Sequence, residues 1–247
     1  MNDKLAEIEL PKFALIVAGG SGSRMESKLP KQFLLLEGKP LLMHTIQAFH
    51  QYDAAMQIIV VLPATQIDKW KQLCQQHAFQ IANKIQAGGA TRFESVKKGL
   101  ALIEEEGLVA IHDGVRPLVN QATIDRTFIA AYEHGSGVAA VDLKDSLRQN
   151  IGTEYKAVDR SRFKIIQTPQ TFRVSQIQQA YNQINHTGFT DDASVSEAAG
   201  NRIFLVAGAY NNFKITTPED LHTAAYLIAH KKSAEKANLP ESRFRSE

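Results

Sequence analysis

The stretch FALIVAGGSGSRM, residues 13–25, decides the fold class of this chain. Its first part, residues 13–17, is apolar and rich in types that favour β-structure, and glycines at positions 19, 20 and 22 follow at once. An apolar run that stops at glycines is typical of a buried strand followed by a loop. Because parallel sheets bind ligands beyond the carboxyl ends of their strands, the loop after this strand is the first candidate binding site.

Outward from this strand, the chain alternates between apolar runs and segments with helical spacing. Strands are predicted at 58–62, 80–86, 108–112, 137–141 and 203–206, and helices at 40–51, 66–77, 91–103, 121–134, 174–183, 191–199 and 218–230. This alternation is typical of βαβ units. We therefore expect a single α/β domain over residues 1–247, with a Rossmann-like, mainly parallel twisted sheet and helices on both of its faces.

Residues 142–167 interrupt the alternation. They are polar, contain the turn signal Asn-Ile-Gly at 150–152, and have alternating segments on each side, so we predict a β-hairpin arm. Such an arm has little core of its own, and we expect a partner subunit to cover it, which predicts a homodimer. Residues 231–247 are charged, and we expect a frayed tail there.

The composition excludes several classes of protein. With 247 residues, 44% hydrophobic content and a formal charge of +2, the composition does not imply a large surface for nonspecific nucleic-acid binding. Cys74 is the single cysteine, so neither an intrachain disulfide nor a cysteine-based zinc cluster can form. No signal peptide is predicted, and no apolar stretch approaches the roughly 20 residues that cross a bilayer. We expect a cytoplasmic protein that binds neither nucleic acid nor membrane.

The glycine loop has two cations nearby, Arg24 and Lys31. Backbone N–H groups of glycines can approach an anion closely, and the two side chains add positive charge. The loop is not a P-loop, because no Gly-Lys-Ser/Thr ends it, and it lacks the third glycine of the dinucleotide fingerprint. We predict triphosphate binding here; the alternative is a plain tight turn beside solvated charges.

Several further motifs follow at regular intervals along the chain. They are Pro-Lys-Gln-Phe at 30–33, GGATRFESV at 88–96, HDGVRP at 112–117, VDR at 158–160, TPQ at 168–170, TDDAS at 190–194 and FKITTPED at 213–220. Together with residues 17–25 they resemble the sugar-nucleotide and polyol-phosphate nucleotidyltransferases. More narrowly, they resemble the 2-C-methyl-D-erythritol 4-phosphate cytidylyltransferase family over residues 12–228.

The resemblance implies transfer of CMP from CTP to a polyol phosphate, with pyrophosphate as the leaving group. The attacking phosphate monoester is already largely dianionic at pH 7, because its second pKa is about 6, so it needs no general base. Positioned cations and Mg²⁺ would stabilise the charge that develops on the α-phosphorus. We expect Mg²⁺ to be held mainly by the CTP phosphates, and not by a cage of protein ligands.

The resemblance also implies a role for individual residues. The catalytic cations would be Arg24 and Lys31, and the acceptor would be bound by Ser146, Arg160, Thr190 and Lys214. The nucleotide would be bound by Ala18, Gly19, Gly20, Ser21, Gly22, Gly89, Ser95 and Asp113, with Gly89 and Ser95 at the cytosine base. On the arm, Ser146 and Arg160 would serve the active site of the partner subunit.

Each assignment has a structural alternative. Ser95 could be an ordinary residue in the first turns of a helix, Asp113 could cap the following turn, and Arg160 could pair with Asp159 or Asp145. We expect His112 and Arg116 to be structural. Four positions depart from many relatives: Gly114 and Val115 replace Ala-Ala, Ala90 replaces an acidic residue, and Ser146 replaces a threonine.

Two other functions remain open at this stage. A ribitol-5-phosphate cytidylyltransferase would share the glycine loop and its cations, although the TDDAS segment at 190–194 favours the erythritol-phosphate enzyme. A nonenzymatic nucleotide-binding module on the same fold is the second alternative. Retention of both Arg24 and Lys31 argues against it, because a binding module does not need a clamp for the transition state.

Overall fold

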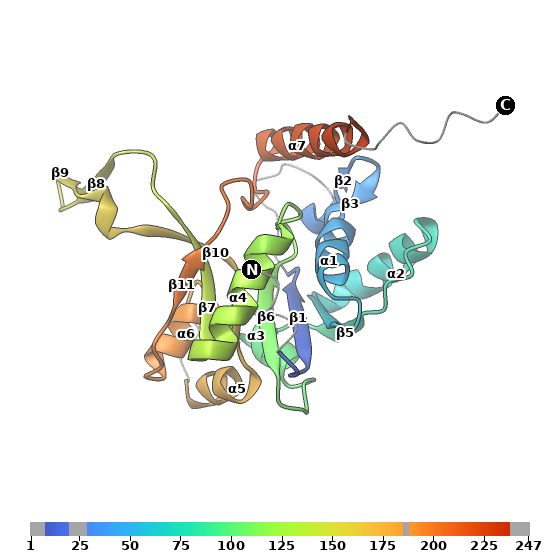
Figure 1. The fold of residues 1–247 in the computed structure, drawn as a ribbon, viewed down its shortest axis with the longest axis horizontal. Helices are drawn as coiled ribbons and strands as arrows, with labels where there is room; N and C mark the ends of the chain where they lie inside the picture. Colours follow the sequence, from blue (N-terminus) through green and yellow to red (C-terminus); the bar gives the residue numbers. More distant parts are fainter. Residues whose placement is uncertain (1–7, 20–28, 185–187, 238–247) are drawn as a thin grey trace.

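The computed structural model describes residues 8–19, 29–184 and 188–237, with side chains as far as residue 230. A seven-stranded sheet in the order β11-β7-β10-β6-β1-β4-β5 forms its centre (Figure 1). The strands are β1 (Lys12–Val17), β4 (Gln57–Leu62), β5 (Lys84–Ala87), β6 (Leu108–Asp113), β7 (Ser136–Asp142), β10 (Lys164–Arg173) and β11 (Leu205–Ala207). Strand β10 runs antiparallel to both neighbours, and the other pairings are parallel. The sheet is therefore mainly parallel, as predicted.

Helices cover both faces of the sheet. One face carries α1 (Leu41–Tyr52), α2 (Ile67–Gln76) and α4 (Gln121–His134), and the other carries α3 (Arg92–Leu100), α5 (Val174–Gln183) and α6 (Asp192–Ala198). Successive side chains of β1 alternate between these two cores: Ala14 and Ile16 pack on the first, Phe13 and Leu15 on the second. Burial on both faces explains why the central strands are continuous apolar runs.

One side of α1 is buried completely. Leu41, Leu42, Thr45, Ile46 and Phe49 all have an exposed fraction of 0%. Their spacing places them on one side of the helix, and each large apolar side chain contributes about 1.5–3 kcal/mol when fully buried. This side of the helix is thereby fixed in the interior of the molecule.

The hairpin arm is present and projects away from the sheet (Figure 1). Strands β8 (Leu147–Asn150) and β9 (Tyr155–Val158) pair with each other, and the short helix η4 (Arg160–Arg162) follows. The arm is shorter than predicted, because residues 164–167 belong to β10. Backbone pairing of Lys164, Ile165 and Ile166 with the end of β7 draws this segment into the central sheet.

Two further elements differ from the expectation. Strand β10 was not predicted at all over residues 168–173. Helix α7 (Pro218–Ala237) continues past residue 230 into the stretch expected to be a frayed tail, of which residues 238–247 lie outside the described part. Helix α7 packs over β2 (Leu35–Leu36), which forms a small hairpin with β3 (Lys39–Pro40). Within the described ranges, no helix has both the length and the apolar character needed to cross a membrane.

Candidate active site

A cleft opens where the parallel strands end. Its cavity volume is about 230 Å³, a little below the range of about 300–1,000 Å³ usual for small-molecule sites. Its walls come from the loops after β1, β4, β5 and β6, from the segment after the glycine loop and from the segment before α7. The lining residues are Val17, Ala18, Gly19, Lys31, Gln32, Pro63, Gly88, Gly89, Ala90, Thr91, Arg92, Ser95, Asp113, Val115 and Lys214.

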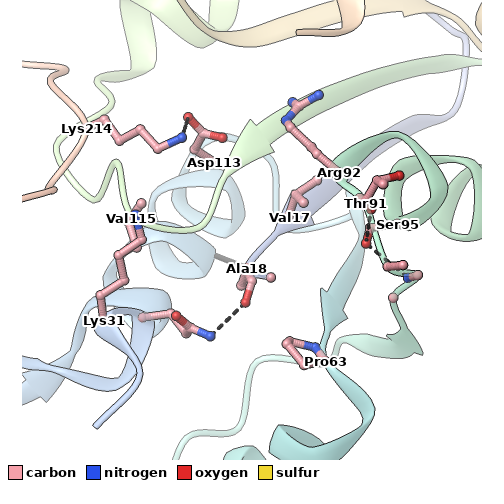
Figure 2. Close-up of a pocket in the computed structure, with 15 residues that line it drawn as sticks. Val17, Ala18, Lys31, Pro63, Thr91, Arg92, Ser95, Asp113, Val115 and Lys214 are labelled. Atoms are coloured by element: carbon pink, nitrogen blue, oxygen red, sulfur yellow. Dashed lines mark hydrogen bonds and ion pairs between the residues drawn. The ribbon is translucent and has the colours of Figure 1, made fainter. Parts of the chain in front are cut away.

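The end of β1 is tied to the segment that carries Lys31. The Ala18 N–H donates to the Val61 carbonyl at 2.9 Å, and the Ala18 carbonyl accepts from Gln32 Nε2 at 2.8 Å (Figure 2). Gln32 is completely buried and lies in the helix η2 (Lys31–Phe33), directly after Lys31. The first residues of the glycine loop and Lys31 therefore share one support. Gly20, Ser21, Gly22 and Arg24 lie outside the described residues.

The loop after β5 is fixed by hydrogen bonds within itself. The Ser95 hydroxyl accepts from the Gly89 N–H at 3.1 Å and donates to the Thr91 carbonyl at 2.8 Å. Thr91 caps α3 by accepting from the Glu94 N–H at 3.1 Å. A Cβ on Gly89 would lie 2.3 Å from Glu94 Cβ, so this position requires glycine. The loop is preorganised, and a role of Ser95 at the base stays a prediction.

Asp113 lies at the end of β6 on another wall of the cleft. Its Oδ2 accepts from Arg116 Nε at 3.1 Å and lies 3.3 Å from Lys214 Nζ (Figure 2). Burial favours the neutral acid, but the positive charges of Lys214, Arg116 and Arg92 together outweigh it and lower the pKa of Asp113. Asp113 is therefore a carboxylate at neutral pH and holds Lys214 at the cleft.

His112 and Arg116 are structural, as expected. The His112 ring is fully buried, packs edge-on against Phe49 and has its Nε2 at 3.2 Å from the Arg116 carbonyl. Burial lowers the pKa of His112 to about 4, so the ring is neutral at pH 7. Arg116 also donates to the Asn212 carbonyl at 2.8 Å, which links the loop after β6 to the segment that carries Lys214.

A family model named "IspD: 2-C-methyl-D-erythritol 4-phosphate cytidylyltransferase" matches residues 13–230. The chain belongs to this cytidylyltransferase family. The protein of that name from Bacteroides thetaiotaomicron is 50% identical over 214 residues, which are 87% of this chain and 98% of the relative.

Solved structures of the cytidylyltransferase family have the same fold. The 4-diphosphocytidyl-2C-methyl-D-erythritol synthase of Anaerococcus prevotii superposes with a TM-score of 0.75 at 26% identity, covering 89% of this chain and 99% of that one. The 2-C-methyl-D-erythritol 4-phosphate cytidylyltransferase of Thermus thermophilus gives 0.73 at 30% identity, covering 90% and 100%. The predicted fold class is confirmed by this agreement.

The cleft brings together some of the residues predicted for a cytidylyltransferase and not others. Ala18, Gly19, Lys31, Gly89, Ser95, Asp113 and Lys214 all line it. The remaining acceptor residues lie elsewhere in the chain. Ser146 and Arg160 are exposed on the arm, and Thr190 is exposed just before α6 and outside the lining. Arg160 donates to the backbone carbonyl of Lys144, whereas Asp159 accepts from Ser161.

Among the lining residues that had no role in the prediction are Gln32 and Arg92. Both occur inside the quoted motifs, but nothing in the sequence indicates their partners. Arg92 makes a two-point ion pair with Asp192, at 2.7 Å and 2.6 Å. That partner is 100 positions away in the chain. In the described ranges, no group of three or more His, Cys, Asp or Glu side chains has the arrangement of a metal site.

Proposed function

We propose that this chain transfers the cytidylyl group of CTP to 2-C-methyl-D-erythritol 4-phosphate and releases pyrophosphate, in the non-mevalonate route to isoprenoid precursors. The observation that carries the proposal is that one cleft is lined both by glycines that follow the strands β1 and β5 and by the cations Lys31 and Lys214. Membership of the cytidylyltransferase family assigns the nucleotide and the acceptor. Ribitol 5-phosphate as acceptor is not favoured, because the matching family model and relatives name the erythritol enzyme.

The reaction is a single displacement at the α-phosphorus of CTP. An oxygen of the acceptor phosphate forms the new P–O bond, and the bond from the α-phosphorus to the bridging oxygen of pyrophosphate breaks. Lys31 and Arg24 would stabilise the negative charge that develops on the α-phosphate, and Lys214 would hold the acceptor phosphate. The chemistry asks the protein to position two polyanions, and a preorganised cleft with fixed cations meets that demand.

Magnesium fits this cleft as a partner of the nucleotide. Mg²⁺ is usually bound by one or two carboxylates together with substrate phosphates, and Asp113 contributes an ionised carboxylate to the lining. The Oδ2 atom of Asp113 is occupied by Arg116 and Lys214. The phosphates of CTP would therefore supply most of the ligands, and the bound ion would neutralise charge on them.

We infer a homodimer in which the arm completes the neighbouring site. The arm exposes large apolar side chains: Tyr155 is 67% exposed and Ile151 is 51% exposed. A lone two-stranded hairpin is marginal in water, so a covering surface would stabilise it. Ser146 and Arg160 would then act in the partner's cleft. A cytoplasmic location remains a prediction.

Substitution of the two cations tests whether this cleft does the chemistry. We expect Lys31→Ala and Arg24→Ala each to lower kcat by about 10²-fold or more, because one preorganised donor contributes roughly 2.7–4 kcal/mol to the transition state. Pyrophosphate release with CTP, Mg²⁺ and methylerythritol phosphate measures it. Lys71→Ala is the matched control, since Lys71 is an exposed lysine on α2. A kcat near that of the parent protein in both Lys31→Ala and Arg24→Ala would rule out the assignment.

A further inference from the structure

A buried ion pair lies beside the cleft and joins two segments that are distant in sequence. Arg92 is the first residue of α3, and Asp192 is the first residue of α6. The two guanidinium nitrogens Nη1 and Nη2 donate to the two carboxylate oxygens at 2.7 Å and 2.6 Å. The Asp192 side chain is fully buried and that of Arg92 is 24% exposed. A two-point pair of this kind fixes orientation as well as distance.

Both carboxylate oxygens of Asp192 already accept hydrogen bonds, and the side chain is fully buried. Its Oδ1 accepts a second hydrogen bond from the Tyr181 hydroxyl at 2.6 Å, and its backbone N–H donates to Gln170 Oε1 at 2.9 Å. Gln170 Nε2 in turn donates to Asp191 Oδ2 at 3.1 Å, and Asp191 Oδ1 caps α6. Asp192 is therefore unsuited to bind a metal or a substrate, and what it holds is Arg92.

The pair connects the two halves of the expected reaction. On one side, Arg92 directly follows Thr91 and lines the cleft with the loop at 88–91, which is predicted to bind the nucleotide. On the other side, Asp192 lies two residues after Thr190, which is predicted to contact the acceptor. In Figure 2, Arg92 and Thr91 lie on the opposite side of Ala18 from Lys31. The Arg92–Asp192 pair therefore supports the wall of the cleft that faces Lys31.

Stability alone does not account for this arrangement. A buried ion pair costs desolvation on both sides, and apolar side chains of similar volume often stabilise a protein as well or better. What the pair provides is a fixed spacing between α3 and α6, which an apolar contact would define less sharply. Misplacement of a bound reactant by about 1 Å can cost on the order of 10²-fold in rate.

We propose that Arg92 and Asp192 are positioning residues, a latch that holds the nucleotide loop at 88–91 in register with the acceptor segment at 190–192. The identity of the two ligands rests on the proposed function. Whatever the acceptor is, breaking the latch weakens CTP binding in protein that remains folded. It also raises the KM for the acceptor, because the loop at 88–91 and the segment at 190–192 move relative to one another.

The test is Asp192→Asn, which keeps the shape of the side chain and removes its charge. The affinity for CTP with Mg²⁺ is measured by calorimetry with no acceptor present, and the KM for methylerythritol phosphate is measured separately. We expect a Kd for CTP and an acceptor KM each raised by about tenfold or more. Folded protein with both values within twofold of the parent would overturn the proposal.

Tyr181→Phe is the matched control, because it removes the hydroxyl from Asp192 and leaves both Arg92–Asp192 hydrogen bonds in place. It should lower Tm while the Kd for CTP stays within twofold. Equal weakening of CTP binding by both variants would show a general loss of stability and contradict the latch.

If Asp192→Asn does not fold, Arg92→Lys carries the same test, since lysine keeps the charge but cannot make the two-point contact. The calorimetric readout also separates the two proposals. A parent protein that binds CTP but does not turn over methylerythritol phosphate would refute the function and leave the latch testable.

Discussion

Asp113 shows how the cleft keeps several charges in place before any ligand arrives. Its carboxylate stays ionised against the effect of burial because Lys214, Arg116 and Arg92 surround it. In return it holds the Lys214 ammonium at 3.3 Å, although the Lys214 side chain is 41% exposed. Without that anchor a flexible lysine would lose more conformational freedom when it meets a phosphate. Asp113 therefore both balances the positive charge of its neighbours and holds the Lys214 ammonium in place for a phosphate.

His112 should make the stability of the fold sensitive to pH. In the unfolded chain its ring takes up a proton below about pH 6.5, whereas in the folded protein it does so below about pH 4. Between these values the unfolded state binds more protons, so acidification from pH 6.5 to 4 lowers the free energy of unfolding. From pH 7 to pH 5 this amounts to about 2 kcal/mol.

Urea unfolding of the parent protein and of His112→Gln at both pH values measures the effect. The parent should lose more stability on acidification than the variant, because the variant lacks the titrating ring. An equal loss in the two proteins would contradict the buried, neutral assignment of His112.

Residues that work through neighbours in sequence were predictable, and residues that work through distant partners were not. The positions of Gly19, Lys31 and Asp113 in the lining of the cleft follow from strand ends and local motifs. The bond from Gln32 to Ala18 spans 14 positions, and the bond from Arg92 to Asp192 spans 100. No periodicity or composition indicates a contact of that kind.

Among the elements, the arm is the one whose proposed role depends most on a second subunit. Strands β8 and β9 form their own two-stranded sheet and make no ladder with the central one. The central sheet therefore has no backbone pairing with these two strands, and a lone two-stranded hairpin is marginal in water.

Replacing residues 146–158 with a short Gly-Ser turn should give a folded monomer. We expect a Tm close to that of the parent, loss of the dimer and at least a tenfold loss of turnover, because the arm would supply Ser146 and Arg160 to the partner. Light scattering and the pyrophosphate assay measure these properties. Arg160→Ala is the control that should keep the dimer and lose turnover. A parent protein that is both monomeric and active would refute the role of the arm.

The elements that sequence periodicity missed have physical reasons. Strand β10 contains Pro169, which has no N–H and normally argues against a central strand. The structure accommodates it at a shift in register between Ile166 and Gln170, where pairing with β7 is interrupted. Helix α7 extends to Ala237 through a charged segment, and charge alone does not stop a helix in which lysine, glutamate and alanine are good helix formers.

At the scale of the whole molecule, the sheet order places the cleft. From β1 the chain continues to β4 and β5 on one side and then crosses to β6 on the other. Parallel α/β sheets bind ligands at such a switch point, beyond the carboxyl ends of the strands. Ala18 directly follows β1 and Asp113 is the last residue of β6, and both line the cleft. The fold thus sets where the nucleotide is expected, and the side chains set the chemistry.

The measurement that tests this account most directly is pyrophosphate release by the purified protein with Mg²⁺ and CTP, comparing methylerythritol phosphate with ribitol 5-phosphate at equal concentration. The account predicts pyrophosphate and a matching amount of a CDP-linked product with methylerythritol phosphate, and little release with ribitol 5-phosphate. Release with ribitol 5-phosphate alone, or with neither acceptor from a folded dimer that binds CTP, would contradict it.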